Sequence, residues 1–181
     1  MFYTLIEQAE LRNKLIDRID VLNKVKELFL IPKLEMMSIG QVADFFEVNT
    51  TNIRQILLKH RDELEQDGII VYTGKELRQV LSEITLVKKL DNTRISIDIP
   101  GAKSITVGNS KTTFFPPRAV LRIGMLLRDS EVAKEVRTQL LKNEKTYSAL
   151  ALYNLPLYSS SRYNHSEDKG MERRVGFIER Q

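Results

Sequence analysis

Residues 39–58 read IGQVADFFEVNTTNIRQILL and fit the twenty-position pattern of a helix-turn-helix. Two helices that cross at about 90–120° share only a small core, so one contact residue must be small and a fixed set must be apolar. Ala43 is the small residue, and Glu47 occupies the turn position that glycine usually holds, so we expect a turn without glycine. Amphipathic helix pairs of other kinds also meet this spacing, which leaves a structural helix pair as the alternative. The apolar positions are filled by Val42, Phe46, Val48, Ile53 and Ile56.

Polar side chains follow in the second half of this pattern and would face outward from its second helix. Arginine pairs with guanine O6 and N7, asparagine and glutamine pair with adenine N6 and N7, and threonine hydroxyls bind phosphates or bases. These residue types favour a helix that contacts double-stranded DNA, with an ordinary helix surface as the alternative. The acidic residues between Asp62 and Asp67 would have to point away from DNA. The candidate DNA-binding residues are Asn49, Thr50, Thr51, Asn52, Arg54, Gln55 and Lys59.

Helical periodicity surrounds the motif. It predicts one helix over residues 5–31, which Pro32 ends because the residue before a proline is pushed out of the helical region. Ser38 is a candidate N-cap of the first motif helix. The second motif helix is predicted from about Thr51 to Gln66, with Gly68 after its end. The apolar residues that define the helix over 5–31 are Leu11, Leu15, Leu22, Val25 and Phe29.

The period of the apolar residues changes after Gly68. Short β-branched or alternating runs predict strands at 69–72, 94–99, 105–107 and 112–115, with a brief helix that contains Leu77, Val80 and Leu81. Pro116-Pro117 opens a further helix, and Asp129-Ser130 caps the last one. The sequence therefore predicts an α+β protein with a small antiparallel sheet and two C-terminal helices after the helix-turn-helix. We expect three parts, namely the N-terminal helix with the helix-turn-helix over 1–83, a basic β-plus-two-helix unit over 84–145, and a flexible tail over 146–181.

The composition argues against an enzyme. The chain has no Cys and only two His, which removes disulfides, thiol nucleophiles and most imidazole chemistry. Its scattered carboxylates lack a metal-binding spacing, so we expect neither a metal nor a cofactor. Residues 108–113 lack the Gly-Lys-Ser/Thr ending of a phosphate-binding loop and indicate a polar hairpin turn. The apolar runs are too short for a membrane span and the first residues lack signal-peptide features, so we expect a cytoplasmic protein of a bacterial cell, associated with the nucleoid.

Charge is unevenly distributed along the chain, whose formal net charge is +4. Residues 1–83 contain 11 Lys and Arg against 14 Asp and Glu, whereas residues 84–145 contain 12 against 6. A basic segment favours a polyanion partner, because phosphate neutralisation releases counterions. Arg118 and Arg122 would share one helix face, and together with Arg128 they are candidate phosphate contacts. Solvated surface charge is the alternative.

Parts of the sequence resemble phage and prophage regulators of Gram-positive bacteria. The resemblance lies in the segments VLNKVKEL (21–28), QVADFFEV (41–48) and RDEL (61–64), and above all in TFFPPRAVLRIGMLLRDSEVAKEVR (113–137). The last segment is similar to the end of BRO-N and antirepressor-type domains, where a strand leads into a helix, a Ser-containing turn and a charged helix. The resemblance covers about residues 20–142 and implies DNA binding and viral regulation rather than catalysis.

Two further expectations concern partners. We expect a homodimer that binds operator DNA through its helix-turn-helix, because one recognition helix covers only a few base pairs. The helix over 5–31 is the predicted interface, unless it packs inside its own subunit. The alternative function is an antirepressor-type interaction module that binds a repressor or another phage or host regulatory protein. A basic stripe through Arg118, Arg122 and Arg128 would favour DNA, and an apolar patch on the same face would favour a protein partner.

Overall fold

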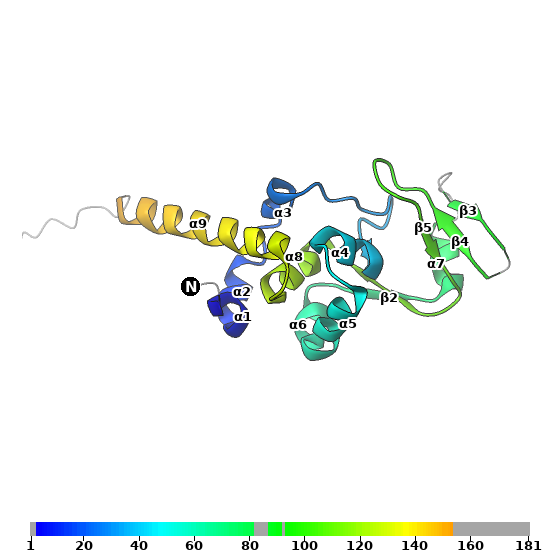
Figure 1. Cartoon of the computed structure of the whole chain (residues 1–181), viewed down its shortest axis with the longest axis horizontal. Helices are drawn as coiled ribbons and strands as arrows, with labels where there is room; N and C mark the ends of the chain where they lie inside the picture. The colour runs from blue at the N-terminus through cyan, green and yellow to red at the C-terminus, as the bar shows by residue number, and fades with distance from the viewer. Residues whose placement is uncertain (1–2, 82–86, 92, 154–181) are drawn as a thin grey trace, which may run out of the picture.

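Helices and strands alternate along the chain, and the α+β class is confirmed with 53% helix and 15% strand. The computed structural model describes residues 3–81, 87–91 and 93–153, and Figure 1 shows how their elements are arranged. The helices are α1 (Tyr3–Glu7), α2 (Ala9–Leu15), α3 (Asp20–Val25), α4 (Ile39–Phe46), α5 (Thr50–Lys59), α6 (Arg61–Gln66), α7 (Gly74–Val80), α8 (Pro117–Leu126) and α9 (Glu131–Tyr153). The strands are β1 (Met37–Ser38), β2 (Ile70–Tyr72), β3 (Val87–Lys89), β4 (Ile95–Ile97), β5 (Ile105–Val107) and β6 (Thr112–Phe115).

A three-stranded antiparallel sheet joins distant parts of the chain. Its central strand β6 pairs with β1 on one side and with β2 on the other, so that Met37 lies opposite Phe115 and Ile70 lies opposite Phe114. Successive residues of a strand point to opposite faces of the sheet. Phe114 and Phe115 accordingly enter two different hydrophobic clusters, and both are fully buried. β6 therefore anchors the helix-turn-helix, which begins directly after β1, to both clusters.

The larger cluster surrounds α8. Residues 119–126 of this helix are all buried, which is expected of a helix enclosed on every side. The cluster includes buried side chains of α4, α5 and α9 together with those of α8. The helix-turn-helix and the two C-terminal helices thus share one core. The expected boundary between residues 83 and 84 does not divide this packing.

The smaller cluster is built mainly from residues between β2 and β6, and it also contains Ile31 and Phe114. A second antiparallel sheet, β3-β4-β5, buries Ile95 and Ile97 against Leu77 of α7. Figure 1 shows this sheet and α7 at one end of the molecule, beyond the tips of β2 and β6. The predicted strands at 105–107 and 112–115 and the helix around Leu77 are confirmed. β1 and β3 were not predicted, because a two-residue strand and a three-residue strand carry too little pattern.

The predicted single helix over residues 5–31 is wrong. The chain forms α1, α2 and α3 instead, and residues 26–36 are not helical. Arg12 ends α1 by donating from Nη1 to the carbonyl oxygens of Leu5 and Ile6, both at 3.0 Å. Leu5 and Leu22 are both fully buried, yet on one straight helix they would point about 100° apart. The breaks between α1 and α2 and between α2 and α3 allow both side chains to enter the same core.

The last helix is longer than the sequence indicates. Residues 146–153, which we expected in a flexible tail, belong to α9. The rest of the predicted tail, 154–181, lies outside the described residues. Across the described part of the chain, no helix is long and apolar enough to cross a membrane.

Candidate nucleic-acid interface

Side-chain caps fix the beginnings of both motif helices. Ser38 and Gln41 form a capping box at α4, in which Ser38 Oγ accepts from the Gln41 backbone N–H and Gln41 Oε1 accepts from the Ser38 N–H. At α5, Asn49 Oδ1 accepts from the Thr51 backbone N–H at 2.9 Å. These caps satisfy backbone donors that a helix start leaves free. The predicted N-cap at Ser38 is confirmed, and Asn49, which is exposed, caps α5 through its Oδ1.

The turn between α4 and α5 forms without glycine, as expected. Glu47 adopts the left-handed conformation with φ 56° and ψ 44°. The Val48 backbone N–H then donates to the Ala43 carbonyl oxygen at 3.0 Å, which closes the end of α4. A non-glycine residue pays a steric cost in this conformation. Lys26 Nζ lies 3.0 Å from Glu47 Oε1 and links the turn to the segment after α3.

The seam between the two motif helices is apolar, as the twenty-position pattern predicts. Val42, Phe46 and Ile53 are fully buried and Ala43 is 2% exposed. The other two predicted seam residues, Val48 and Ile56, are partly buried and pack against the same cluster. Because the seam belongs to the core around α8, α5 has a fixed orientation and only one of its faces meets solvent.

That outward face of α5 carries a regular set of exposed side chains. Thr51, Arg54, Gln55, Leu58 and Lys59 are all exposed, at spacings of three, four, seven and eight residues from Thr51. We call these five residues the α5 face. Helical positions three and four apart are neighbours, so the five side chains form one continuous surface. Thr50 and Asn52 are only partly exposed, and Thr50 Oγ1 accepts from Arg54 Nη1 at 3.2 Å.

Sequence reasoning missed Leu58. Its spacing of three and four residues from Gln55 and Arg54 was the available signal, but the search for DNA-contacting residues considered polar and basic side chains. The predicted helix to Gln66 also ends earlier, because His60 leaves helical geometry with φ −125° and ψ 34° and separates α5 from α6. The acidic side chains of residues 62–67 therefore belong to another helix and its C-terminal end. α5 itself contains no Asp or Glu.

Arg122 is not a phosphate contact, contrary to the prediction from sequence. Its side chain is 2% exposed and donates from Nε and Nη2 to Asp67 at 2.5 and 2.9 Å. Its Nη1 donates to Asn13 Oδ1 at 2.7 Å and to Glu63 Oε2 at 2.8 Å. The reason is the packing of α8, which is enclosed on all sides and turns Arg122 toward the carboxylates of α6 and its C-cap. Burial lowers the pKa of Arg122, but hydrogen bonds and charge from Asp67 and Glu63 leave it raised overall.

The other two predicted phosphate contacts have different surroundings. Arg118 is half exposed and already pairs with Asp67 at 3.3 Å and Asp17 at 2.5 Å. Arg128 follows α8 and is exposed. Since Arg122 is buried between carboxylates and Arg118 is paired with two of them, these three arginines do not form the expected basic stripe.

The ion pairs around Arg122 extend to α2. Arg12 donates from Nε and Nη2 to Glu63 at 2.9 and 2.5 Å, and His60 Nδ1 lies 3.2 Å from Glu63 Oε1. Burial raises the pKa of Glu63, but the hydrogen bonds from Arg12 and His60 and the charges of Arg12 and Arg122 hold it below its usual value. This network ties α2, α6 and α8 together behind α5.

The predicted dimer interface lies largely within the subunit. Leu15 and Leu22 are buried in the larger cluster, Leu11 and Val25 pack against it, and Phe29 packs against the smaller cluster. Leu15 and Leu22 are therefore not exposed to a second copy, and the other three side chains are partly covered by their own subunit. The alternative expectation, packing inside the subunit, describes them correctly.

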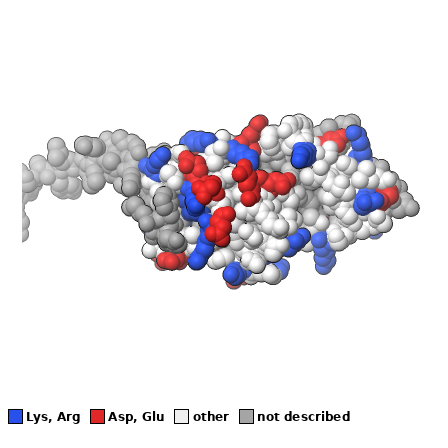
Figure 2. All heavy atoms as spheres, in the orientation of Figure 1, with Lys and Arg blue, Asp and Glu red and all other residues white. Residues whose placement is uncertain are grey.

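Surface charge distinguishes α5 from its surroundings. Figure 2 shows acidic side chains gathered over α3, α4 and the start of α9. The exposed acidic residues of those three elements include Asp20, Asp44, Glu131 and Glu135. Lysines of the same elements pair with two of these carboxylates, Lys24 with Asp20 and Lys134 with Glu131, so this face is of mixed charge. The α5 face, in contrast, carries two cations and no carboxylate.

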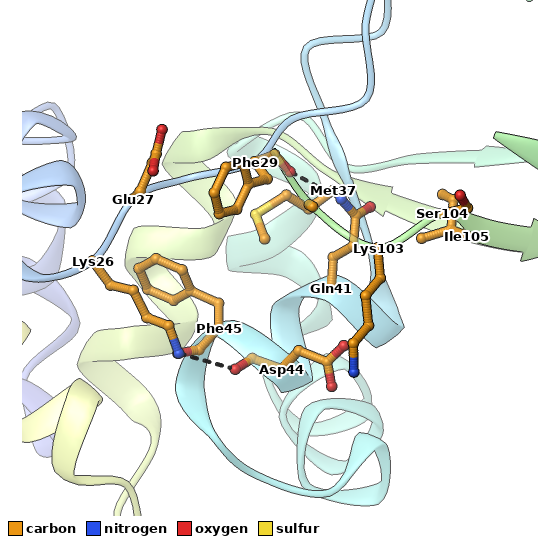
Figure 3. A pocket seen from close by; sticks show the side chains of 11 residues that line it. Lys26, Glu27, Phe29, Met37, Gln41, Asp44, Phe45, Lys103, Ser104 and Ile105 are labelled. Atoms are coloured by element: carbon orange, nitrogen blue, oxygen red, sulfur yellow. Dashed lines mark hydrogen bonds between the residues drawn. The ribbon is translucent and has the colours of Figure 1, made fainter. Parts of the chain in front are cut away.

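A cavity of about 410 Å³ lies beside α4 (Figure 3). Phe29, Met37 and Phe45 form an apolar wall, and Lys103 and Asp44 lie at its edge. Gly101 adopts φ 79°, and a Cβ there would lie 2.8 Å from Phe29 Cε1, so the turn before β5 needs glycine to pack on this wall. No residue of α5 lines the cavity, which is thus separate from the α5 face.

No protein-family model matches the sequence, and no curated protein or solved structure is significantly similar to it. The resemblance to phage regulators stays a prediction.

Proposed function

We propose that this protein is a sequence-specific DNA-binding regulator, of the phage or prophage type, in which the α5 face contacts base edges in the major groove. The observation that carries the proposal is the exposed face itself. Four of its five residues are polar or basic types that bind bases or phosphates, while the opposite face of α5 is fixed in the core. A recognition helix needs this combination of a rigid support and an exposed face.

The side chains of the α5 face would make two kinds of contact, to base edges and to phosphates. Arg54 and Gln55 lie at the middle of the α5 face, where a helix in the major groove approaches the base edges. Arg54 uses one N–H donor to bind Thr50 Oγ1. Because a guanidinium has five donors, Arg54 can still donate two hydrogen bonds to a guanine edge. Lys59 lies at the end of the helix, where a compact cation contacts the phosphate backbone. Thr51 is close to the start of α5 and suits either a base or a phosphate.

The proposal includes a homodimer. One α5 covers only a few base pairs, whereas two copies related by a twofold axis would contact half-sites separated by about 34–36 Å. The surface that joins them must differ from the N-terminal residues that the subunit buries. A palindromic site would support the dimer, and a site without internal symmetry would count against it.

Selection of bound fragments from random double-stranded DNA, at a fixed and stated salt concentration, tests the proposal. We expect a common site to be enriched and its affinity to fall steeply with added salt. Recovery of random sequences with no enrichment would contradict the proposal and would favour an antirepressor-type role with a protein partner.

Two matched charge reversals show whether α5 is the contact surface. Arg54→Glu places an acidic group on the α5 face and should abolish enrichment of the site. Arg61→Glu makes the same change on α6, where Arg61 pairs with exposed Glu65. It should leave enrichment intact. Equal effects of the two reversals would show a general charge effect rather than a contact through α5.

A further inference from the structure

Leu58 is the most exposed large apolar side chain among the described residues, at 77% exposure. It belongs to neither hydrophobic cluster, whereas its neighbours Ile56 and Leu57 pack against the larger one. The core therefore gives no reason for leucine at this position. Its surroundings on the helix are polar, since Arg54, Gln55 and Lys59 lie at spacings of four, three and one residues.

The chemistry of the major groove offers one apolar group to such a side chain. Each base pair presents donors and acceptors there, and only thymine adds a methyl group, at C5. We propose that Leu58 packs against a thymine methyl and makes the site specific for thymine at that position. This inference rests on the proposed DNA-binding function and adds a specificity-determining residue to it.

The helix geometry places the contact. Leu58 lies four residues after Arg54, and a rise of 1.5 Å per residue separates them by about 6 Å along the axis. With base pairs spaced by about 3.4 Å, the thymine lies about two base pairs from the base that Arg54 contacts. The α5 face would then combine a polar contact and an apolar contact on neighbouring parts of one half-site.

A protein partner is the competing explanation for an exposed leucine. Surfaces that bind proteins expose contiguous apolar patches of several hundred Å². The α5 face instead surrounds one leucine with a threonine, an arginine, a glutamine and a lysine. This mixture fits base edges better than an apolar protein surface.

Replacement of thymine by uracil tests the contact, because it removes the C5 methyl and leaves the base pairing unchanged. The probe is the selected DNA site with uracil placed at one thymine at a time, and the readout is the ratio of the two dissociation constants. We expect one position, about two base pairs from the Arg54 contact, where uracil weakens binding about fourfold, the effect of one buried CH₂-sized group. Leu58→Ala should bind the thymine site more weakly and should no longer distinguish thymine from uracil, whereas Leu58→Met should retain the discrimination.

Leu90→Ala is the matched control, because Leu90 is 54% exposed but lies between β3 and β4, away from α5 in the sequence. It should leave the thymine-to-uracil ratio unchanged. Binding of a specific site with no sensitivity to uracil at any position would overturn the role of Leu58 and leave the proposed function standing. Absence of DNA binding by the wild-type protein would overturn both. A change of oligomeric mass in Leu58→Ala, with unchanged DNA affinity, would assign Leu58 to a protein interface.

Discussion

Arg122 and Asp67 form an ion pair in the interior of the protein, with the two side chains only 2% and 1% exposed. The guanidinium of Arg122 spans both carboxylate oxygens, at 2.5 and 2.9 Å. A paired geometry of this kind offsets the cost of removing two charges from water, but only while both partners are present. The pair joins α8 to the C-cap of α6 and so supports α5 from behind.

Removal of Arg122 should destabilise the fold rather than weaken a phosphate contact. Arg122→Ala removes the buried partner of Asp67 and leaves its carboxylate with the longer 3.3 Å contact from half-exposed Arg118, so we expect a loss of about 3 kcal/mol in the free energy of unfolding. Urea denaturation measures it. Arg128→Ala, at an exposed position, is the control and should change stability by less than about 0.5 kcal/mol. An Arg122→Ala protein of wild-type stability would show that the pair does not support the fold.

Acid should weaken the network around Glu63. The pKa of Glu63 is lower in the folded protein than its ordinary value of 4.5, so its contribution to stability is present above about pH 4.5 and is lost as the pH falls through the folded value. The Glu63→Gln variant has no carboxyl group at this position and does not titrate in this pH range. Urea midpoints between about pH 3 and 7 should therefore differ most between the two proteins at neutral pH and converge in acid. A difference that stays constant over this range would contradict the assignment.

Replacement of the turn residue Glu47 by glycine should stabilise the protein. Glu47→Gly removes the steric cost of the left-handed conformation, about 1–2 kcal/mol, but loses an exposed ion pair with Lys26 and adds freedom to the unfolded chain. We expect a net stabilisation of about 0.5–1 kcal/mol in thermal or urea unfolding. Glu47→Ala loses the ion pair and keeps the strain, so it should be less stable than wild type. Equal stability of the two variants would show that the turn conformation is not costly.

Local patterns predicted much of this fold. The cap at Ser38, the seam residues Val42 and Ile53, and the strands at 105–107 and 112–115 depend on residues close in sequence, and the structure confirms them. Pairing across long separations was beyond such patterns. The two-residue β1 depends on its pairing with Phe114 and Phe115, and the break between α1 and α2 is the place where Arg12 binds the carbonyl oxygens of Leu5 and Ile6.

The candidate interface was predicted in part. Residue type and spacing indicated Thr51, Arg54, Gln55 and Lys59, which the structure places together on one exposed face. Arg122 was misassigned because charge composition does not show which arginines are buried with carboxylates. Leu58 was missed because the candidates were chosen by polar and basic residue type, and an apolar side chain is recognised as part of the exposed face only when the orientation of the helix is known.

Lys59 should contribute affinity without contributing specificity. A lysine that contacts phosphate neutralises one charge whatever the sequence, so Lys59→Ala should weaken binding to all DNA fragments by a similar factor. The slope of log affinity against log salt should fall by about one. Lys24→Ala, which removes a lysine that pairs with Asp20 on α3, is the control and should leave the slope unchanged. A variant at Lys59 that changes sequence preference would instead place this side chain at a base.

The central claim, that α5 contacts bases, is tested most directly by the double variant Arg54→Ala/Gln55→Ala. Its affinities for the selected site and for a scrambled duplex are measured at the same salt concentration, together with those of Arg61→Ala/Gln66→Ala, which removes the same two residue types from the exposed surface of α6. Loss of an arginine that contacts a base costs about 1–3 kcal/mol of specific binding, so the preference for the selected site should fall at least about fivefold to tenfold in the α5 variant and remain in the α6 variant. A folded Arg54→Ala/Gln55→Ala protein with wild-type affinity and wild-type sequence preference would contradict the claim.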